Sequence, residues 1–289
     1  METKGFHRIL LATDGSAQAA AAVAVTASFA HASGAAVRVV HVWNLEVHHR
    51  QDSWDIEMLG EAEKLIDETI NQLRAAGIQA EGTISQADSH HVSAAVAQAA
   101  RDLQADLVVV GSRGLSDWQS MRKHSVSHQL ISALDCPLLI VRDKAPVSVH
   151  DAQRVVLAIA GGDDVVAGTR AAIAAASAPG SRVLVVHVVQ AVIGVQGMAY
   201  VETQDEVAET LKRATTMLAE AGVAAEAVAA EPGAVAHVVA ETAAGWKADV
   251  IVIGSSRMGD VASLLLGSVT HDLLRVATQP VLVAERIKS

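Results

Sequence analysis

Residues 105–112 read Ala-Asp-Leu-Val-Val-Val-Gly-Ser, and residues 248–255 read Ala-Asp-Val-Ile-Val-Ile-Gly-Ser. Each stretch is a short apolar run that ends in Gly-Ser, a pattern typical of a buried strand followed by a tight turn. The second stretch begins 143 residues after the first, because 248 minus 105 is 143. In a chain of 289 residues, a repeat at this distance predicts two copies of one domain.

Three further pairs of stretches support the duplication. Two of these pairs have an offset of 146 residues and the third again has an offset of 143: residues 8–12 with 154–158, 39–42 with 185–188, and 137–141 with 280–284. Pro146 and a mixture of charges interrupt the pattern between Lys144 and Asp151, which is where we expect the linker. We therefore predict two domains, residues 1–146 and residues 147–289.

The composition predicts the fold class. Hydrophobic residues make up 51% of the chain but aromatic residues only 2%, so Ala, Val, Ile and Leu must form the core. Each half contains five short apolar runs separated by helical patterns, an alternation that favours parallel strands joined by helices. We predict an α/β protein with two tandem copies of a five-stranded parallel sheet that carries helices on both faces.

Charge and cysteine content exclude several classes of function. The formal net charge is -10, which argues against binding to the phosphate backbone of nucleic acids. Cys136 is the single cysteine and forms no disulfide within the chain, which suits a reducing compartment. We recognise neither a signal peptide nor a membrane span in the sequence. The expectation is a cytoplasmic protein that contacts neither nucleic acid nor membrane.

A glycine- and hydroxyl-rich segment follows the fourth apolar run of each half. Glycines allow backbone amides to approach phosphate oxygens closely, and a following helix adds further donors and a favourable dipole. Serine and threonine hydroxyls complete such a cradle. The candidate phosphate ligands are Gly111, Gly114, Ser125 and Ser127 in the first half, and Gly254, Gly267, Ser268 and Thr270 in the second.

These segments, the Asp14-Gly15-Ser16 turn and the His-Val pair in the second apolar run resemble the universal stress protein family over essentially the whole chain. ATP-binding members of that family carry Gly-x2-Gly-x9-Gly-Ser/Thr in this place. The resemblance implies an adenine nucleotide such as ATP, with Mg²⁺, as the ligand. It also implies that Asp14 helps to hold the nucleoside and that main-chain groups at Val42 and Val188 contact adenine.

The resemblance has consequences for role and assembly as well. It implies a regulatory protein of the stress response, in which any ATP hydrolysis is slow and incidental. It further implies that the last strands, residues 138–141 and 281–283, pair in a pseudo-twofold arrangement, so that one chain imitates the dimer of single-domain relatives. A homodimer of such chains is a further expectation.

Three residues depart from the family pattern. His124 stands where the third glycine of the first half is expected, and Arg257 replaces the second glycine of the second half. Sequence comparison places Gly161 at the position of Asp14, so the second half lacks the acidic nucleoside contact. His124 either obstructs the phosphates or, when protonated, donates to them and makes the site sensitive to pH. Arg257 either pairs with a phosphate or is solvated.

Two readings of function stay open. The first is a nucleotide-binding regulator, with the first domain favoured because it keeps Asp14, Gly111 and Gly114. The second is a degenerate scaffold that acts through protein partners or another small ligand. Histidine pairs such as His90-His91 lack companion ligands at metal-binding spacing, so we predict no metal site. We expect His41 and His187 to be hydrogen-bonded structural residues.

Overall fold

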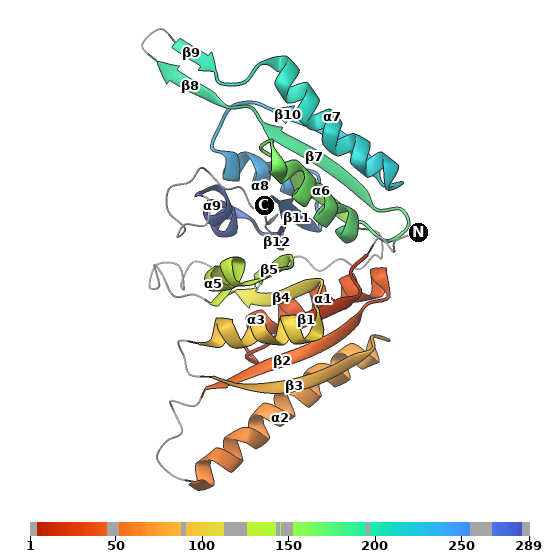
Figure 1. Cartoon of the computed structure of the whole chain (residues 1–289), viewed down its shortest axis with the longest axis vertical. Helices are drawn as coiled ribbons and strands as arrows, with labels where there is room; N and C mark the ends of the chain where they lie inside the picture. Colours follow the sequence, from red (N-terminus) through yellow and green to blue (C-terminus); the bar gives the residue numbers. More distant parts are fainter. Residues whose placement is uncertain are drawn as a thin grey trace. The chain divides into compact units, whose positions relative to one another are not determined.

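The computed structural model describes residues 5–44, 52–87, 91–112, 126–142, 145, 153–194, 197–254 and 268–284. The chain divides into two compact units, a first unit within residues 6–149 and a second unit within residues 150–289 (Figure 1). Both have the predicted α/β architecture, so the fold class and its duplication are confirmed. The predicted boundary between residues 146 and 147 lies outside the described residues and stays a prediction, as does the pairing of the last strands of the two units.

Five parallel strands form the sheet of the first unit in the order β5-β4-β1-β2-β3. These strands are β1 (Arg8–Ala12), β2 (Ala36–Asn44), β3 (Ala80–Ala87), β4 (Leu107–Ser112) and β5 (Leu138–Arg142). The central strands β1 and β4 are almost wholly apolar, and Leu10, Leu11 and Val109 are fully buried. Strands covered on both faces take such continuous apolar runs.

Helices cover both faces of this sheet. They are α1 (Ala17–Ser33), α2 (Asp52–Ala75), α3 (Val92–Leu103) and α5 (Val126–Ala133). The first two pack against one face, α1 over β1, β4 and β5 and α2 over β2 and β3, while α3 packs against β1, β2, β3 and α5 (Figure 1). Gly34 ends α1 in a left-handed conformation with a φ of 72°, which glycine adopts without a steric penalty.

The second unit repeats this order as β12-β11-β6-β7-β10. Its parallel strands are β6 (Arg154–Ala158), β7 (Arg182–Val188), β10 (Ala224–Ala230), β11 (Val250–Ile253) and β12 (Val281–Val283). Its helices are α6 (Asp163–Ala175), α7 (Gln204–Glu220), α8 (Val235–Gly245) and α9 (Ser268–Val276). Helices α6 and α7 pack together, as do α8 and α9.

A short antiparallel hairpin in the second unit was not predicted. It consists of β8 (Ala191–Gly194) and β9 (Gly197–Tyr200), which leave the sheet after β7 and return to α7 (Figure 1). Its strands are only four residues long, too short for their composition to identify them.

The Ala-Asp pair that opens each repeated stretch fixes the start of the central strands. The Asp106 carboxylate accepts hydrogen bonds from the backbone N–H groups of His7 and Arg8, at 2.8 and 2.9 Å. In the second unit, the Asp249 carboxylate accepts a hydrogen bond of 2.7 Å from the backbone N–H of Arg154. Each aspartate therefore ties the beginning of one central strand to its neighbour.

Gly82 allows α2 to lie close to the edge strand β3. A Cβ atom at this position would lie 2.3 Å from Cγ2 of Ile66 and 2.8 Å from Cδ1 of Ile70. Real Cβ atoms do not approach neighbours so closely, so any larger residue forces the side chains of Ile66 and Ile70 to shift.

We expect Gly82→Ala to lower the free energy of unfolding by about 1–3 kcal/mol, because the new methyl group overpacks this contact. Urea denaturation measures the change. The matched control is Gly60→Ala in α2, where a Cβ meets no atom within 4 Å. It should raise the stability by about 0.5–1 kcal/mol through helix propensity. Equal stability of the two variants would contradict this view of the packing.

Candidate functional site

The carboxyl ends of β1 and β4 define the candidate site of the first unit. The two strands are neighbours, with Ala12 opposite Val110, yet the sheet continues to β2 and β3 on one side and to β5 on the other. Connections that leave neighbouring strands in opposite directions open a crevice at their carboxyl ends, where ligands of parallel α/β proteins bind. Asp14 follows β1 and Gly111 lies at the end of β4, so both predicted residues stand at this edge.

A capped turn presents Asp14 at this edge. The Asp14 side chain is exposed, and its Oδ1 accepts a hydrogen bond of 3.0 Å from the backbone N–H of Ser16. The Ser16 hydroxyl in turn accepts from the backbone N–H of Ala19 and caps α1. Gly15 lies between them with a φ of 74°. Within the described part of the chain, the second carboxylate oxygen of Asp14 has no hydrogen-bond or ion-pair partner.

His41 ends the pairing between β1 and β2. The last main-chain bond runs from the N–H of Thr13 to the carbonyl of Val40, at 3.0 Å. The Nδ1 atom of His41 then lies 2.9 Å from the Thr13 carbonyl oxygen. The predicted structural role of this histidine is therefore confirmed. Val42 is half-buried and lies past the last bond of this ladder, so its main chain borders the crevice.

Only part of the predicted phosphate segment lies within the described residues. Gly111 is half-buried beside Val141 of β5. Ser127 belongs to the first turn of α5, but its side chain is not among those described. Gly114, His124 and Ser125 lie outside the described residues, and their roles stay predictions.

The position equivalent to Asp14 is not acidic in the second unit. Here the N–H of Ile159 donates to the carbonyl of Val186 at 3.0 Å, and Nδ1 of His187 lies 3.1 Å from the Ile159 carbonyl oxygen. Ile159 therefore corresponds to Thr13, and the next residue, Ala160, corresponds to Asp14. The sequence comparison that paired Gly161 with Asp14 was wrong by one residue. Gly161 corresponds to Gly15, since both have a positive φ, 129° and 74°.

Gly254 is explained by the packing of α6. A Cβ atom on Gly254 would lie 2.8 Å from Cβ and 3.1 Å from Cγ of Asp164, so this side chain stands directly against the glycine. A Cβ on Gly168 would lie 3.6 Å from the Gly254 nitrogen. The first turns of α6 thus occupy the space above the end of β11. The position equivalent to Asp164 in the first unit is the uncharged Gln18, because 164 minus 146 is 18.

The other predicted ligands of the second unit are less accessible or not described. Val188 and Thr270 are both buried. Ser268 begins α9, but its side chain is not described. Arg257 and Gly267 lie outside the described residues. The predicted phosphate cradle of the second unit therefore stays untested at its center.

Comparison with known protein families decides the identity of the fold. The model of the universal stress protein family matches residues 5–142 and again residues 152–285. The chain belongs to the universal stress protein family. Two family domains in one chain also agree with the predicted duplication.

Individual universal stress proteins resemble the chain over one half or over its whole length. A tandem-length relative from Mycobacterium tuberculosis is 25% identical over 299 residues, covering 97% of each chain. A Thermus aquaticus relative is 35% identical over 133 residues, covering 45% of this chain and 96% of its own. The crystal structure of a universal stress protein from Archaeoglobus fulgidus covers 99% of this chain and 100% of its own, with a TM-score of 0.74 at 21% identity.

The described residues of this universal stress protein contain neither a metal-binding cluster nor a membrane-spanning helix. Within these residues, no group of three or more His, Cys, Asp or Glu side chains is arranged to hold a metal ion. The helices described also include none that is both long and apolar enough to cross a membrane.

A buried histidine and a glutamate connect the site edge of the second unit to its hairpin. His187 is 2% exposed, and its Nε2 atom lies 2.5 Å from Oε2 of Glu202. Glu202 follows the hairpin directly and precedes Thr203, the N-cap of α7. Both partners of the imidazole, the Ile159 carbonyl and the Glu202 carboxyl, can accept hydrogen bonds. The imidazole therefore joins the residue that follows β6 to the residue that precedes the N-cap of α7.

A capping box holds the neighbouring start of α7. Hydrogen bonds from the backbone N–H and then from the hydroxyl of Thr203 lower the pKa of the Glu206 carboxyl. The lowered pKa means that this cap stabilises the fold above the unfolded-state pKa of the carboxyl. The stabilisation is lost as the pH falls through the pKa of the folded state.

We expect Glu202→Ala to lower the free energy of unfolding by about 1–2 kcal/mol at neutral pH, because buried His187 loses a hydrogen-bond partner. The loss is limited by the partial exposure of the glutamate. Thermal or urea unfolding followed by circular dichroism measures it. Glu209→Ala, which removes an exposed carboxylate from α7, is the control and should change stability by less than about 0.5 kcal/mol. Indistinguishable variants would show that the His187–Glu202 contact does not hold the second unit together.

Proposed function

We propose that this universal stress protein is a regulatory protein of the stress response that binds ATP or a related adenine nucleotide in its first unit. The observation that supports this most is the exposed carboxylate of Asp14 at the crevice between β1 and β4. A carboxylate in this position accepts hydrogen bonds from the ribose hydroxyls of a nucleoside. Any hydrolysis of the nucleotide is slow and incidental to binding.

The nucleoside end of the proposed site is built from backbone as well as from side chains. Val42 follows the last main-chain bond between β1 and β2, so its amide and carbonyl groups border the crevice. Main-chain donors and acceptors at such an edge recognise the polar rim of adenine. His41 keeps this edge in place through its contact with the Thr13 carbonyl oxygen.

The phosphate end of the proposed site lies beyond β4. Gly111 lies at the end of β4, where glycine permits close approach of a phosphate to backbone amides. We propose that Gly114, Ser125 and Ser127 complete the cradle and that Mg²⁺ accompanies the nucleotide. His124 remains a departure from the family pattern, and its ring either obstructs or hydrogen-bonds the phosphates.

The second unit is less suited to a triphosphate. Ala160 offers no carboxylate to the ribose, and the Asp164 side chain stands against Gly254, where a phosphate would have to approach. A carboxylate at this distance repels a phosphate and also occupies its space. We therefore assign the nucleotide to one site per chain.

A second candidate function is a scaffold that binds no nucleotide and acts through protein partners or another small ligand. The observation that favours it is the same occupation of the second site by α6. If the first site has also lost its ligand, through His124, the duplicated fold retains only its surfaces. A cytoplasmic location and a homodimer are common to both proposals.

We expect ATP with Mg²⁺ at millimolar concentration to raise the melting temperature of the intact chain, because a ligand that binds only the folded state stabilises it. Asp14→Ala should abolish most of this shift. Differential scanning fluorimetry measures the melting temperatures with and without nucleotide.

The matched control for Asp14 is Asp67→Ala, which removes an exposed carboxylate of α2 and should leave the shift unchanged. If the shift persists in Asp14→Ala, the nucleotide does not bind at the proposed place. If the unaltered chain shows no shift at any concentration tested, the scaffold is the better account.

We expect isothermal titration calorimetry to give one nucleotide per chain, because the second unit has Ala160 in place of Asp14 and has Asp164 against Gly254. Asp164→Ala should not reduce this stoichiometry. Two equivalent sites per chain, or a loss of binding in Asp164→Ala, would contradict the assignment to the first unit.

A further inference from the structure

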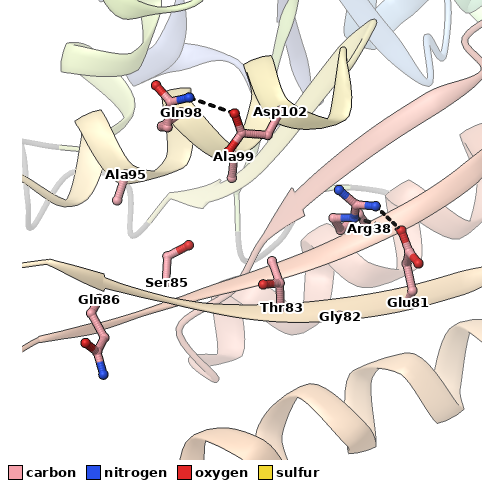
Figure 2. A pocket seen from close by; sticks show the side chains of 10 residues that line it. All are labelled: Arg38, Glu81, Gly82, Thr83, Ser85, Gln86, Ala95, Gln98, Ala99 and Asp102. Atoms are coloured by element: carbon pink, nitrogen blue, oxygen red, sulfur yellow. Dashed lines mark hydrogen bonds and ion pairs between the residues drawn. The ribbon is translucent and has the colours of Figure 1, made fainter.

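A polar groove lies between α3 and the edge strand β3 of the first unit, remote in the sheet from the β1–β4 crevice. Its volume is about 540 Å³, and three elements line it, with β2 contributing Arg38 (Figure 2). From β3 come Thr83 and Ser85, which point toward the helix in Figure 2. From α3 come Ala95 and Ala99, whose small side chains leave the space open.

The side chains of β3 alternate between the two faces of the sheet. Gly82 faces α2, as its contacts with Ile66 and Ile70 show. Neighbouring residues in a strand point to opposite faces, so Glu81, Thr83 and Ser85 face the groove. Among the described residues, the hydroxyls of Thr83 and Ser85 have no protein partner and are available to a ligand.

The outer edge of β3 carries backbone groups that pair with no other strand of the first unit. The N–H of Val37 in β2 donates to the carbonyl of Gln79 at 2.9 Å, which sets the alternation along β3. Odd-numbered residues therefore turn their backbone groups toward β2, and even-numbered residues turn theirs outward. The outward carbonyl of Ala80 is already taken by the Arg74 guanidinium, at 2.8 and 3.1 Å. Within the part of the chain that the structure describes, the outward backbone groups of Gly82, Ile84 and Gln86 pair with no other strand.

An unpaired strand edge beside a helix, with a groove between them, is the arrangement in which an extended peptide adds as a further strand. Main-chain hydrogen bonds provide the affinity of such a complex, and alternate side chains enter the groove. We propose that β3 and α3 bind an extended segment of a partner protein in this way. The segment would pair with Gly82, Ile84 and Gln86.

The charges in the groove restrict the chemistry of the partner. Arg38 is paired with Glu81, so these two charges largely neutralise each other. Asp102 accepts a hydrogen bond of 2.7 Å from the uncharged carboxamide of Gln98, which leaves its negative charge uncompensated by that contact. The partner segment therefore carries a lysine or arginine opposite Asp102. Its other side chains that face the helix are small or hydroxylated, because Thr83, Ser85, Ala95 and Ala99 surround them.

The second unit provides an internal comparison. The offset of 145 between Gly77 and Gly222 places Val228 and Ala230 of β10 where β3 has Thr83 and Ser85. The offset of 143 places Val238 and Thr242 of α8 where α3 has Ala95 and Ala99. Larger residues on the helix and apolar residues on the strand replace the features that form the groove. The proposed binding site is thus a property of the first unit and lies apart from the proposed nucleotide site.

Selection of peptides on the intact chain tests this inference. A displayed library of random ten-residue peptides is the probe, and the affinities of enriched peptides are measured with purified variants. Gln86→Pro removes an outward N–H but no bond to β2, so an edge strand tolerates it. We expect this variant to weaken peptide binding about tenfold, because one main-chain hydrogen bond to the peptide is lost. Gln86→Ala keeps the N–H and should bind within about twofold of the original chain.

Two more variants test the groove and its charge independently of the strand. Ala95→Leu fills the groove from the helix side and should weaken binding at least about tenfold. If circular dichroism shows that the Gln86→Pro variant does not fold, the Ala95→Leu variant decides the test instead. Asp102→Lys should weaken binding of peptides that contain a basic residue.

Several outcomes would overturn the proposal. One is a library that yields no peptide sensitive to these variants. Another is a set of peptides that bind the Gln86→Pro and Gln86→Ala variants with equal affinity. Equal affinity for the Ala95→Leu variant and the original chain would have the same meaning. A third is concentration-dependent self-association, seen by analytical ultracentrifugation, that Gln86→Pro abolishes, because the occupant of the edge would then be a second copy of this chain.

Discussion

The parallel pairing of β1 with β4 is the constraint on which the rest of the first unit depends. Asp106 fixes the start of this pair by accepting hydrogen bonds from the backbone of His7 and Arg8. Leu10, Leu11 and Val109 are completely buried in the middle of this pair. The chain leaves the two strands in opposite directions, and in parallel α/β folds such a reversal is where a crevice opens at the carboxyl ends. Asp14, Val42 and Gly111 face a common region for this reason, although they are far apart in sequence.

Duplication has preserved the scaffold and changed its edges. Asp249 repeats the contact of Asp106, and His187 repeats the contact of His41 with the carbonyl that follows the first strand. At the crevice, however, Ala160 replaces Asp14, and Asp164 closes over Gly254 where the first unit has Gln18. The edge strands differ as well, since β3 faces small helical residues and β10 faces larger ones. The two units therefore share one scaffold but differ at the edges where ligands are proposed to bind.

The sequence predicted the architecture because buried parallel strands appear as short apolar runs that alternate with helical patterns along the chain. The repeated Ala-Asp-strand-Gly-Ser stretches identified β4 and β11, and the His-Val pairs identified the ends of β2 and β7. Other features depend on contacts that the patterns do not contain. The approach of Asp164 to Gly254 is a tertiary contact between residues 90 positions apart, so no local pattern could reveal it. Two adjacent glycines after β6 allowed a shift of one residue, which hid the correspondence of Ala160 with Asp14. The hairpin and Glu202 had no sequence signal long enough to detect.

Hydrogen–deuterium exchange of the intact chain, with and without ATP and Mg²⁺, tests the central claim most directly. A nucleotide that binds at the carboxyl ends of β1 and β4 should protect backbone amides of residues 13–19 and 109–112. The corresponding amides of residues 159–165 and 252–254 in the second unit should exchange at unchanged rates. Protection confined to the second unit, or none in either unit while ATP is bound, would contradict the account.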